Sequence, residues 1–107
     1  MVSFEDFKKI DMKVADVLEV SDIEGKDKLF LIKISLGEEK RQIVAGLKPF
    51  YTAEELGGKR IIVVSNLDPA SIGGVKSEAM LLAVKDQGGK YRVLEAPEGV
   101  PAGTRLE

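Results

Sequence analysis

The stretch FLIKISLGEEKRQIVAGLKPFYTAEELGGKRIIVV (residues 30–64) decides the fold, because it contains two strand patterns, a helix signal and a wholly apolar strand in that order. Apolar and polar residues alternate over residues 30–36, which predicts a half-buried strand. Residues 37–40 then predict a hairpin turn into the next strand, residues 41–45. Two adjacent antiparallel strands are therefore expected here.

The second half of this stretch predicts a short helix followed by a buried strand. Thr52 and Glu55 have the spacing of a capping box, Leu56 supplies an apolar anchor, and Gly57 is expected to end the helix with a positive φ. Residues 61–64 are β-branched without polar alternation, which is typical of a strand buried on both faces.

Toward the N-terminus, the sequence predicts one more helix, one more strand and a loop. Ser3 and Asp6 have capping-box spacing, which predicts a short N-terminal helix. Apolar side chains fall on even positions over residues 12–20, which predicts a first strand with an interruption, or bulge, at Asp16. Residues 21–28 are polar and contain a glycine, so they are expected to form a loop.

Toward the C-terminus, glycines and prolines divide the chain into shorter pieces. Residues 65–78 contain enough of these breakers to predict an irregular loop, and residues 79–84 predict another strand. Residues 86–90 predict a turn into a last strand, residues 91–94. The tail from residue 95 onward is expected to be irregular.

These elements indicate an all-β fold in a single domain, residues 1–107. Periodicity alone fits a barrel or a sandwich, whereas the helix between strands three and four favours the OB-fold. We therefore expect a five-stranded Greek-key barrel with a short N-terminal helix and an additional C-terminal strand or tail. Ligands of this fold lie on strands two and three, here flanked by the loops 21–28 and 65–78.

Composition excludes several classes of function. The chain has no Cys and no His, so it offers no thiolate, no imidazole and no zinc ligand set. We expect no catalytic residue, no metal and no cofactor. The longest apolar run is residues 79–84, which is too short to cross a bilayer, and residues 1–10 have no secretory signal. A cytoplasmic location without membrane contact is the expectation.

Charge and aromatic residues give a more specific indication. The net charge is −2, but residues 40–92 carry nine bases and five acids, so the middle of the chain is basic. A basic middle segment is compatible with nucleic-acid binding and also with an ordinary charged surface. The aromatic residues Phe50 and Tyr51 are candidates for stacking on a base, and four others are expected in the core: Phe4, Phe7, Phe30 and Tyr91.

Six motifs, in order along nearly the whole chain, resemble one family. They are KIDMKV (9–14), DKL (27–29), RQIVAGL (41–47), EELGGK (54–59), VSNL (64–67) and GVKSEAM (74–80). The family is the tRNA-binding OB domain appended to methionyl-tRNA synthetases, which also occurs as free-standing structure-specific tRNA-binding proteins. The resemblance implies a homodimer, tRNA as a partner, recognition by shape and association with the catalytic part of a methionyl-tRNA synthetase.

The resemblance also implies a tRNA-binding site. Family members use a lysine before strand two and a Ser and Met after strand four, which match Lys28, Ser77 and Met80. Asn66, at the end of strand four, could reach a sugar or a base edge. Each residue has a structural alternative: a solvated lysine for Lys28, hydrogen bonds within turns for Ser77 and Asn66, and a core side chain for Met80.

Three functions remain open from the sequence. The first is a dimeric, structure-specific tRNA-binding module of methionyl-tRNA synthetase. The second is a peptide-binding module, because a secretion-related chaperone shares this fold. The third is an architectural dimerisation domain with weak RNA binding.

Overall fold

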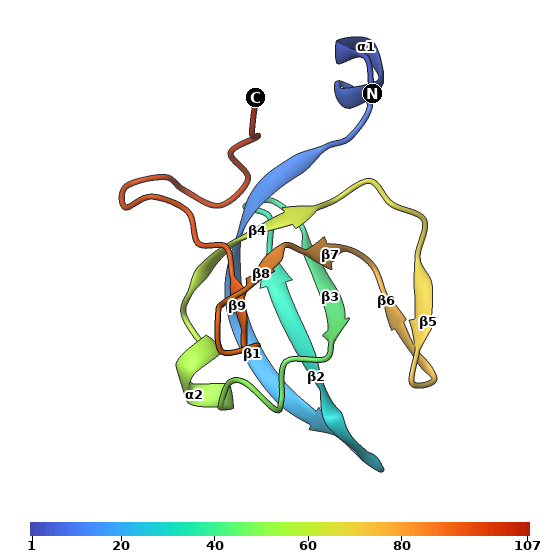
Figure 1. The fold of residues 1–107 in the computed structure, drawn as a ribbon, viewed down its shortest axis with the longest axis vertical. Helices are drawn as coiled ribbons and strands as arrows, with labels where there is room; N and C mark the ends of the chain where they lie inside the picture. Colours follow the sequence, from blue (N-terminus) through green and yellow to red (C-terminus); the bar gives the residue numbers. More distant parts are fainter.

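A computed structural model describes all of residues 1–107, and Figure 1 shows a curled sheet with two hairpins attached to it. The strands of the main sheet lie in the order β3-β2-β1-β4-β7, and β5-β6 and β8-β9 form separate antiparallel pairs. The elements are α1 (Phe4–Phe7), β1 (Met12–Ile23), β2 (Lys26–Ser35), β3 (Lys40–Ala45), α2 (Ala53–Leu56), β4 (Arg60–Val64), β5 (Ala70–Ile72), β6 (Val75–Ser77), β7 (Met80–Leu81), β8 (Ala83–Lys85) and β9 (Tyr91–Val93). The expected all-β OB-like fold is confirmed.

Strand β1 is the strand around which the sheet curls. Its first half, residues 12–16, pairs with β4, whereas residues 16–23 pair with β2. One long strand therefore serves both sides of the barrel, as closure of a small sheet requires. The free edge of β3 is covered by residues 76–78, as the hydrogen bonds of the next subsection show.

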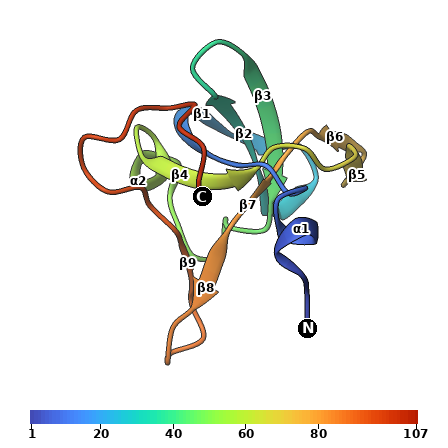
Figure 2. The ribbon, with the colours of Figure 1, turned by 90° about the horizontal axis from the view of Figure 1, so that it is seen from above.

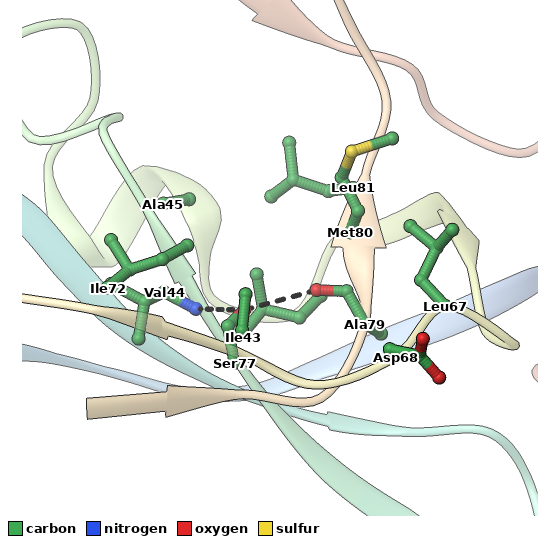
Figure 3. A pocket seen from close by; sticks show the side chains of 11 residues that line it. Ile43, Val44, Ala45, Leu67, Asp68, Ile72, Ser77, Ala79, Met80 and Leu81 are labelled. Carbon is green, nitrogen blue, oxygen red and sulfur yellow. Dashed lines mark hydrogen bonds between the residues drawn. The ribbon is translucent and has the colours of Figure 1, made fainter. Parts of the chain in front are cut away.

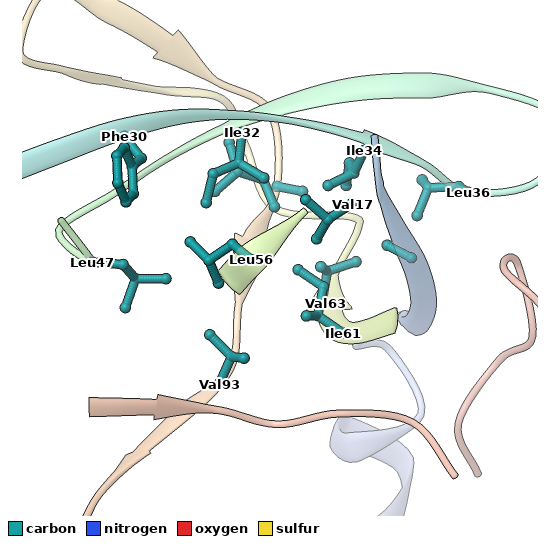
Figure 4. Packing of buried hydrophobic residues seen from close by; sticks show 13 residues of the cluster. Val17, Phe30, Ile32, Ile34, Leu36, Leu47, Leu56, Ile61, Val63 and Val93 are labelled. Atoms are coloured by element: carbon teal, nitrogen blue, oxygen red, sulfur yellow. The ribbon is translucent and has the colours of Figure 1, made fainter. Parts of the chain in front are cut away.

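A single cluster of buried side chains fills the barrel (Figure 4). Strand β2 contributes the alternating series that its sequence predicts, and Ile32 and Ile34 are fully buried. Leu56 of α2 is 1% exposed and belongs to the same cluster. The thirteen members are Ala15, Val17, Phe30, Ile32, Ile34, Leu36, Ile43, Leu47, Leu56, Ile61, Val63, Ala79 and Val93.

The side-chain pattern of β1 differs from the expected one. The residues that enter the core are Ala15 and Val17, at odd positions. The register shift against β2 falls between Val17 and Glu19, which leaves Leu18 about half exposed and places the bulge two residues beyond Asp16. The even-numbered Val14 is also buried, and its backbone is bonded to the C-terminal tail.

Two segments expected to be loops contain paired strands. Strands β1 and β2 continue to a tight turn at Gly25, where φ is +76°, so that Lys28 lies within β2. The segment 65–78 contains the β5-β6 hairpin, and its turn uses the positive φ of Gly73 and Gly74. These glycines form tight turns instead of long loops. The strand expected over 79–84 is split between β7 and β8.

Both predicted helices are present and capped. The Ser3 side chain accepts a hydrogen bond from the Asp6 N–H, and Thr52 and Glu55 form a complete capping box. The glycine with positive φ after α2 is Gly58 (+82°), whereas Gly57 is an ordinary C-cap with φ of −58°. No helix reaches the length and apolar character that a membrane span requires.

Three of the four aromatic residues expected in the core are exposed. Phe30 is buried, but Phe4, Phe7 and Tyr91 are 70%, 41% and 41% exposed. Helix α1 has one turn and projects from the barrel, so its apolar face has no sheet beneath it (Figures 1 and 2).

The irregular tail runs back along its own barrel. The Val14 N–H donates to the Thr104 carbonyl (2.9 Å), the Gly103 N–H donates to the Val14 carbonyl (2.8 Å), and the Leu106 N–H donates to the Met12 carbonyl (2.8 Å). The tail therefore lies along the edge of β1 opposite the one that pairs with β4. Both termini consequently lie at the same end of the molecule (Figure 1).

Two hydrogen-bonded carboxylates, the exposed Glu55 and the half-buried Asp86, predict how stability depends on pH. Hydrogen bonds from Thr52 lower the pKa of Glu55 below its ordinary 4.5, and hydrogen bonds from Lys90 and Arg92 lower the pKa of Asp86 below 3.8. A lowered native pKa stabilises the fold above the unfolded value, and this stabilisation is lost as pH falls through the native pKa. We expect the free energy of unfolding to decrease below about pH 4.5. In denaturant titrations between pH 6 and 3, Glu55→Gln should make this decrease smaller, and an unchanged slope would contradict the assignment.

Candidate nucleic-acid interface

The basic side chains divide into paired and unpaired groups. Of the sixteen Lys and Arg residues, nine form ion pairs with carboxylates. The other seven are all lysines, and five of them lie on β2, β3 and β6. We call these five the lysine face: Lys26, Lys28, Lys33, Lys40 and Lys76. Unpaired ammonium groups are available to neutralise an external anion.

Strand pairing places members of the lysine face near one another. Lys33 of β2 pairs in register with Gln42 of β3, and Lys40 precedes Gln42 by two residues, so the three share one side of the sheet. The Gln42 side-chain amide donates to the Lys76 carbonyl (2.7 Å), which brings β6 to this side. Glu19 lies opposite Lys33 in β1, so the face is not free of negative charge.

Hydrogen bonds hold the segment 76–78 against the free edge of β3, and both this segment and β3 contribute donors. The Glu78 N–H donates to the Gln42 carbonyl (2.8 Å), and the Gln42 N–H donates to the Glu78 carboxylate (3.2 Å). The Arg41 guanidinium donates to the carbonyls of Ser65 and Glu78. These contacts hold the hairpin that carries Lys76.

Arg41, Gln42 and Glu78 were not predicted as functional residues. Arg41 and Gln42 lie in the RQIVAGL motif and Glu78 in GVKSEAM, and a family motif was the only signal that could have selected them. Their hydrogen bonds join β3 to residues 65 and 76–78, which are distant in sequence. No local sequence pattern predicts these contacts.

Ser77 is buried and bonded within the fold. It is 6% exposed, and its hydroxyl accepts a hydrogen bond from the Val44 N–H (3.0 Å) and donates to the Ala79 carbonyl (3.2 Å) (Figure 3). The first contact joins β6 to β3, and the second lies within the connection from β6 to β7. The hydroxyl therefore lies beneath the surface, bonded as donor and as acceptor within the fold.

We expect Ser77→Ala to lower the free energy of unfolding by about 1–3 kcal/mol, because the buried Val44 N–H loses its partner. Ser71→Ala, at the exposed neighbouring strand β5, is the matched control and should change little. Thermal unfolding and tRNA titration of both variants measure the effect. Lost affinity with an unchanged melting temperature would instead assign Ser77 a direct contact.

Asn66 connects the end of β4 to the N-terminal segment. Its side-chain oxygen accepts a hydrogen bond from the Asp11 N–H (2.8 Å), and its amide nitrogen donates to the Lys9 carbonyl (2.7 Å). The next residue back, Ser65, donates to Asp11 as well. Both polar groups of Asn66 are thus occupied by the fold.

Lys28 and Met80 are exposed members of the predicted site, and neither side chain forms a hydrogen bond or ion pair within the chain, unlike the exposed Asn66. Lys28 belongs to a bulged part of β2, since Asp22 pairs with Phe30 and Ile23 with Lys26, which leaves residues 27–29 without partners. Met80 is 48% exposed on β7. The structure brings Ser77 and Met80 to one pocket, whereas Lys28 and Asn66 lie outside it.

The pocket lies between β3, the β5-β6 hairpin and β7 and has a volume of about 300 Å³ (Figure 3). Its lining is aliphatic apart from Asp68 and Ser77, and three large apolar side chains are partly exposed there: Leu67, Ile72 and Met80. The turn of the β5-β6 hairpin packs against β2, since a Cβ on Gly73 would lie 2.8 Å from Leu29 Cδ1 and 3.5 Å from Lys26 Cε.

The barrel and its lysine face define a small OB-like domain with a candidate anion-binding surface on strands two and three. The family model described as "putative tRNA binding domain" matches residues 12–105, and the chain belongs to this family.

Three relatives illustrate the similarity. A methionine--tRNA ligase of Caldanaerobacter subterraneus subsp. tengcongensis is 42% identical over 98% of this chain, which covers 16% of that protein. A crystal structure of a MetRS related protein from Pyrococcus horikoshii superposes with a TM-score of 0.93 at 36% identity, covering 100% of this chain and 98% of that one. The CsaA chaperone protein from Picrophilus torridus has a TM-score of 0.90 at 31% identity, with both chains fully covered.

The resemblance seen in the motifs is thus confirmed. The chain spans about one sixth of the length of the ligase it matches, so the activity of a whole ligase does not follow from the match.

Proposed function

We propose that this chain is a non-catalytic, dimeric module that binds tRNA by its shape and assists methionyl-tRNA synthetase, either as an appended domain or as a separate subunit. The observation that carries the proposal is the lysine face on β2, β3 and β6, where OB-folds hold their ligands. Aminoacylation itself would belong to the catalytic part of the synthetase. A cytoplasmic location accompanies this role.

The chemistry of the face favours shape over sequence. Lysine ammonium groups bind phosphates as point charges, and no pair of side chains on this surface is placed to read a base edge with two hydrogen bonds. A-form RNA presents mainly phosphates and 2′-hydroxyls to a protein. Different tRNAs should therefore be bound alike.

Within this proposal, the four candidate residues have two kinds of role. Lys28 would contact phosphate and Met80 would contact a sugar or base, because both side chains are exposed. Ser77 and Asn66 would act as positioning residues, since their polar atoms are bonded to the backbone. Ser77 supports the strand that carries Lys76.

The homodimer has a candidate surface of its own at the two termini. Phe4, Phe7 and Ile10 are exposed and line a hollow of about 400 Å³ together with Leu106. Exposed apolar groups gathered in this way are typical of an interface, and a two-fold axis would bring two copies of the patch together. Sedimentation should give a dimer for the native chain and a monomer of 11.6 kDa for the double variant Phe4→Ser, Phe7→Ser.

Competition binding tests the RNA specificity. Several unrelated tRNAs should displace a labelled tRNA with similar affinity, whereas an unstructured RNA of the same length should compete poorly. Failure of every tRNA to bind would reject the proposal in favour of an architectural dimerisation domain, and strong preference for one anticodon would reject recognition by shape.

A peptide-binding role is the second candidate, because the aliphatic pocket at β3, β5-β6 and β7 is open and the chain superposes on a CsaA chaperone protein. Ile72→Asp would place a second carboxylate in this pocket. Loss of binding to apolar peptides by this variant, combined with unchanged tRNA binding, would favour the chaperone-like role.

A further inference from the structure

The β8-β9 hairpin carries an exposed aromatic side chain on a rigid support. Tyr91 is 41% exposed, and its ring packs edge-on against Phe50 with centroids 5.5 Å apart. Lys85, its cross-strand partner, places Nζ 5.1 Å from the ring centroid. A partly exposed ring fixed by a second aromatic residue presents a flat surface of defined orientation.

The charge of this hairpin is positive. Lys85 and Lys90 are the two unpaired lysines outside the lysine face, whereas Arg92 is paired with Asp86 (3.0 Å). Asp86 also accepts a hydrogen bond from the Lys90 N–H (3.0 Å), which fixes the turn. The only carboxylate of the hairpin is therefore already paired. Lys85 has no ion pair and lies beside the ring, and Lys90, also without an ion pair, directly precedes Tyr91 in the chain.

The hairpin is separate from the surface already described. In Figure 2 it projects from the barrel in a different direction from the β5-β6 hairpin, which carries Lys76. An RNA that spans both surfaces would contact the chain at two distinct places.

We propose that the β8-β9 hairpin is a second RNA-contacting element, on which an unpaired base stacks against Tyr91 while Lys85 and Lys90 bind the adjoining phosphates. Aromatic rings flanked by cations are the usual platform for unpaired nucleotides. In this proposal the base replaces the Lys85 ammonium over the ring, and the ammonium forms an ion pair with a phosphate instead. This inference rests on the proposed tRNA binding. It adds a second contact surface, the β8-β9 hairpin, and specifies the type of contact there as stacking of a nucleotide.

The charge pattern favours a nucleotide over a peptide here. The hollow beside the hairpin is lined mainly by charged side chains of both signs, and the ammonium groups of Lys85 and Lys90 make no ion pair. An apolar peptide would gain little on such a surface, whereas a base with its phosphate matches both the ring and the ammonium groups.

The experiment measures tRNA affinity and its salt dependence for Tyr91→Leu, Tyr91→Phe and the double variant Lys85→Gln, Lys90→Gln. Tyr91→Leu keeps apolar packing against Phe50 but removes the stacking ring, so affinity should fall about 5-fold or more. Tyr91→Phe should stay close to the native value. The double variant should lower the slope of log affinity against log salt by about 1.5, since each phosphate contact contributes roughly 0.7–0.9.

Lys9→Ala is the matched control, because Lys9 is exposed and already paired with Asp6. Melting temperatures identify any variant that is weakened only by loss of stability. If the native chain binds tRNA and both Tyr91→Leu and the double lysine variant bind equally well, the hairpin inference is overturned and the tRNA proposal stands. If the native chain binds no tRNA, both fail.

Discussion

Replacing Lys26, Lys28 and Lys76 together with alanine is expected to weaken tRNA binding by roughly 10- to 150-fold, taking about 0.5–1 kcal/mol for each exposed ion pair. These lysines make no ion pair within the chain, so their charges are available to phosphate. The slope of log affinity against log salt should fall by about 2 to 3, because each released phosphate contact contributes roughly 0.7–0.9. Filter binding or fluorescence anisotropy at several salt concentrations measures both quantities.

The control removes the same amount of charge elsewhere. Lys8, Lys9 and Lys59 are each bound to a carboxylate, so their combined replacement changes the net charge equally without touching the lysine face. Affinity and slope should stay near the native values apart from a small general effect. Equal losses in the two triple variants would mean that net charge, and not this face, determines binding.

Replacing Gly103 with alanine is expected to lower the free energy of unfolding by about 2–3 kcal/mol. Gly103 has a φ of +91°, and a Cβ there would lie 2.5 Å from the Leu36 carbonyl oxygen, which belongs to the β2-β3 connection. The backbone must move, and the tail then loses its hydrogen bonds to β1. Thermal unfolding should show a decrease in melting temperature of roughly 10 to 20 °C.

Gly99→Ala is the control that measures the cost of backbone strain alone, without a close contact between the new Cβ and another residue. Gly99 has a similar φ of +87°, but a Cβ there would meet nothing within 4 Å. This control should cost only about 1 kcal/mol, the strain of a left-handed alanine. If the two variants are equally stable, the contact between the tail and the β2-β3 connection does not stabilise the barrel.

Local patterns in the sequence were sufficient for most of the fold. The alternation in β2 and the capping box at Thr52 each determine an element without help from distant residues. The order of strands and helix then leaves few topologies. The sequence predictions that proved wrong concern segments whose structure depends on contacts with residues distant in the sequence. The edge of β1 at Val14 is bonded to a tail ninety residues away, and residues 70–77 become strands because Gly73 and Gly74 allow a tight turn.

The candidate site was less predictable, because burial and hydrogen bonding decide which atoms are available. A serine in a glycine-rich segment gives no sign in sequence that its hydroxyl bonds the Val44 N–H. Similarly, nothing local to Asn66 reveals that it bonds Lys9 and Asp11. Which lysines are unpaired depends on nine ion pairs, several of them between residues far apart in the sequence, so the lysine face emerges only from the structure.

Titration of the ¹⁵N-labelled chain with tRNA, followed by amide chemical shifts, tests most directly whether the lysine face binds RNA. The account predicts that the largest changes fall on β2, β3 and β6 around Lys26, Lys33, Lys40 and Lys76, and that the tail along β1 changes little. The account would be contradicted if, at saturating tRNA, the shift changes were confined to the tail or to the apolar surface around Phe4, Phe7 and Ile10, with β2, β3 and β6 unaffected.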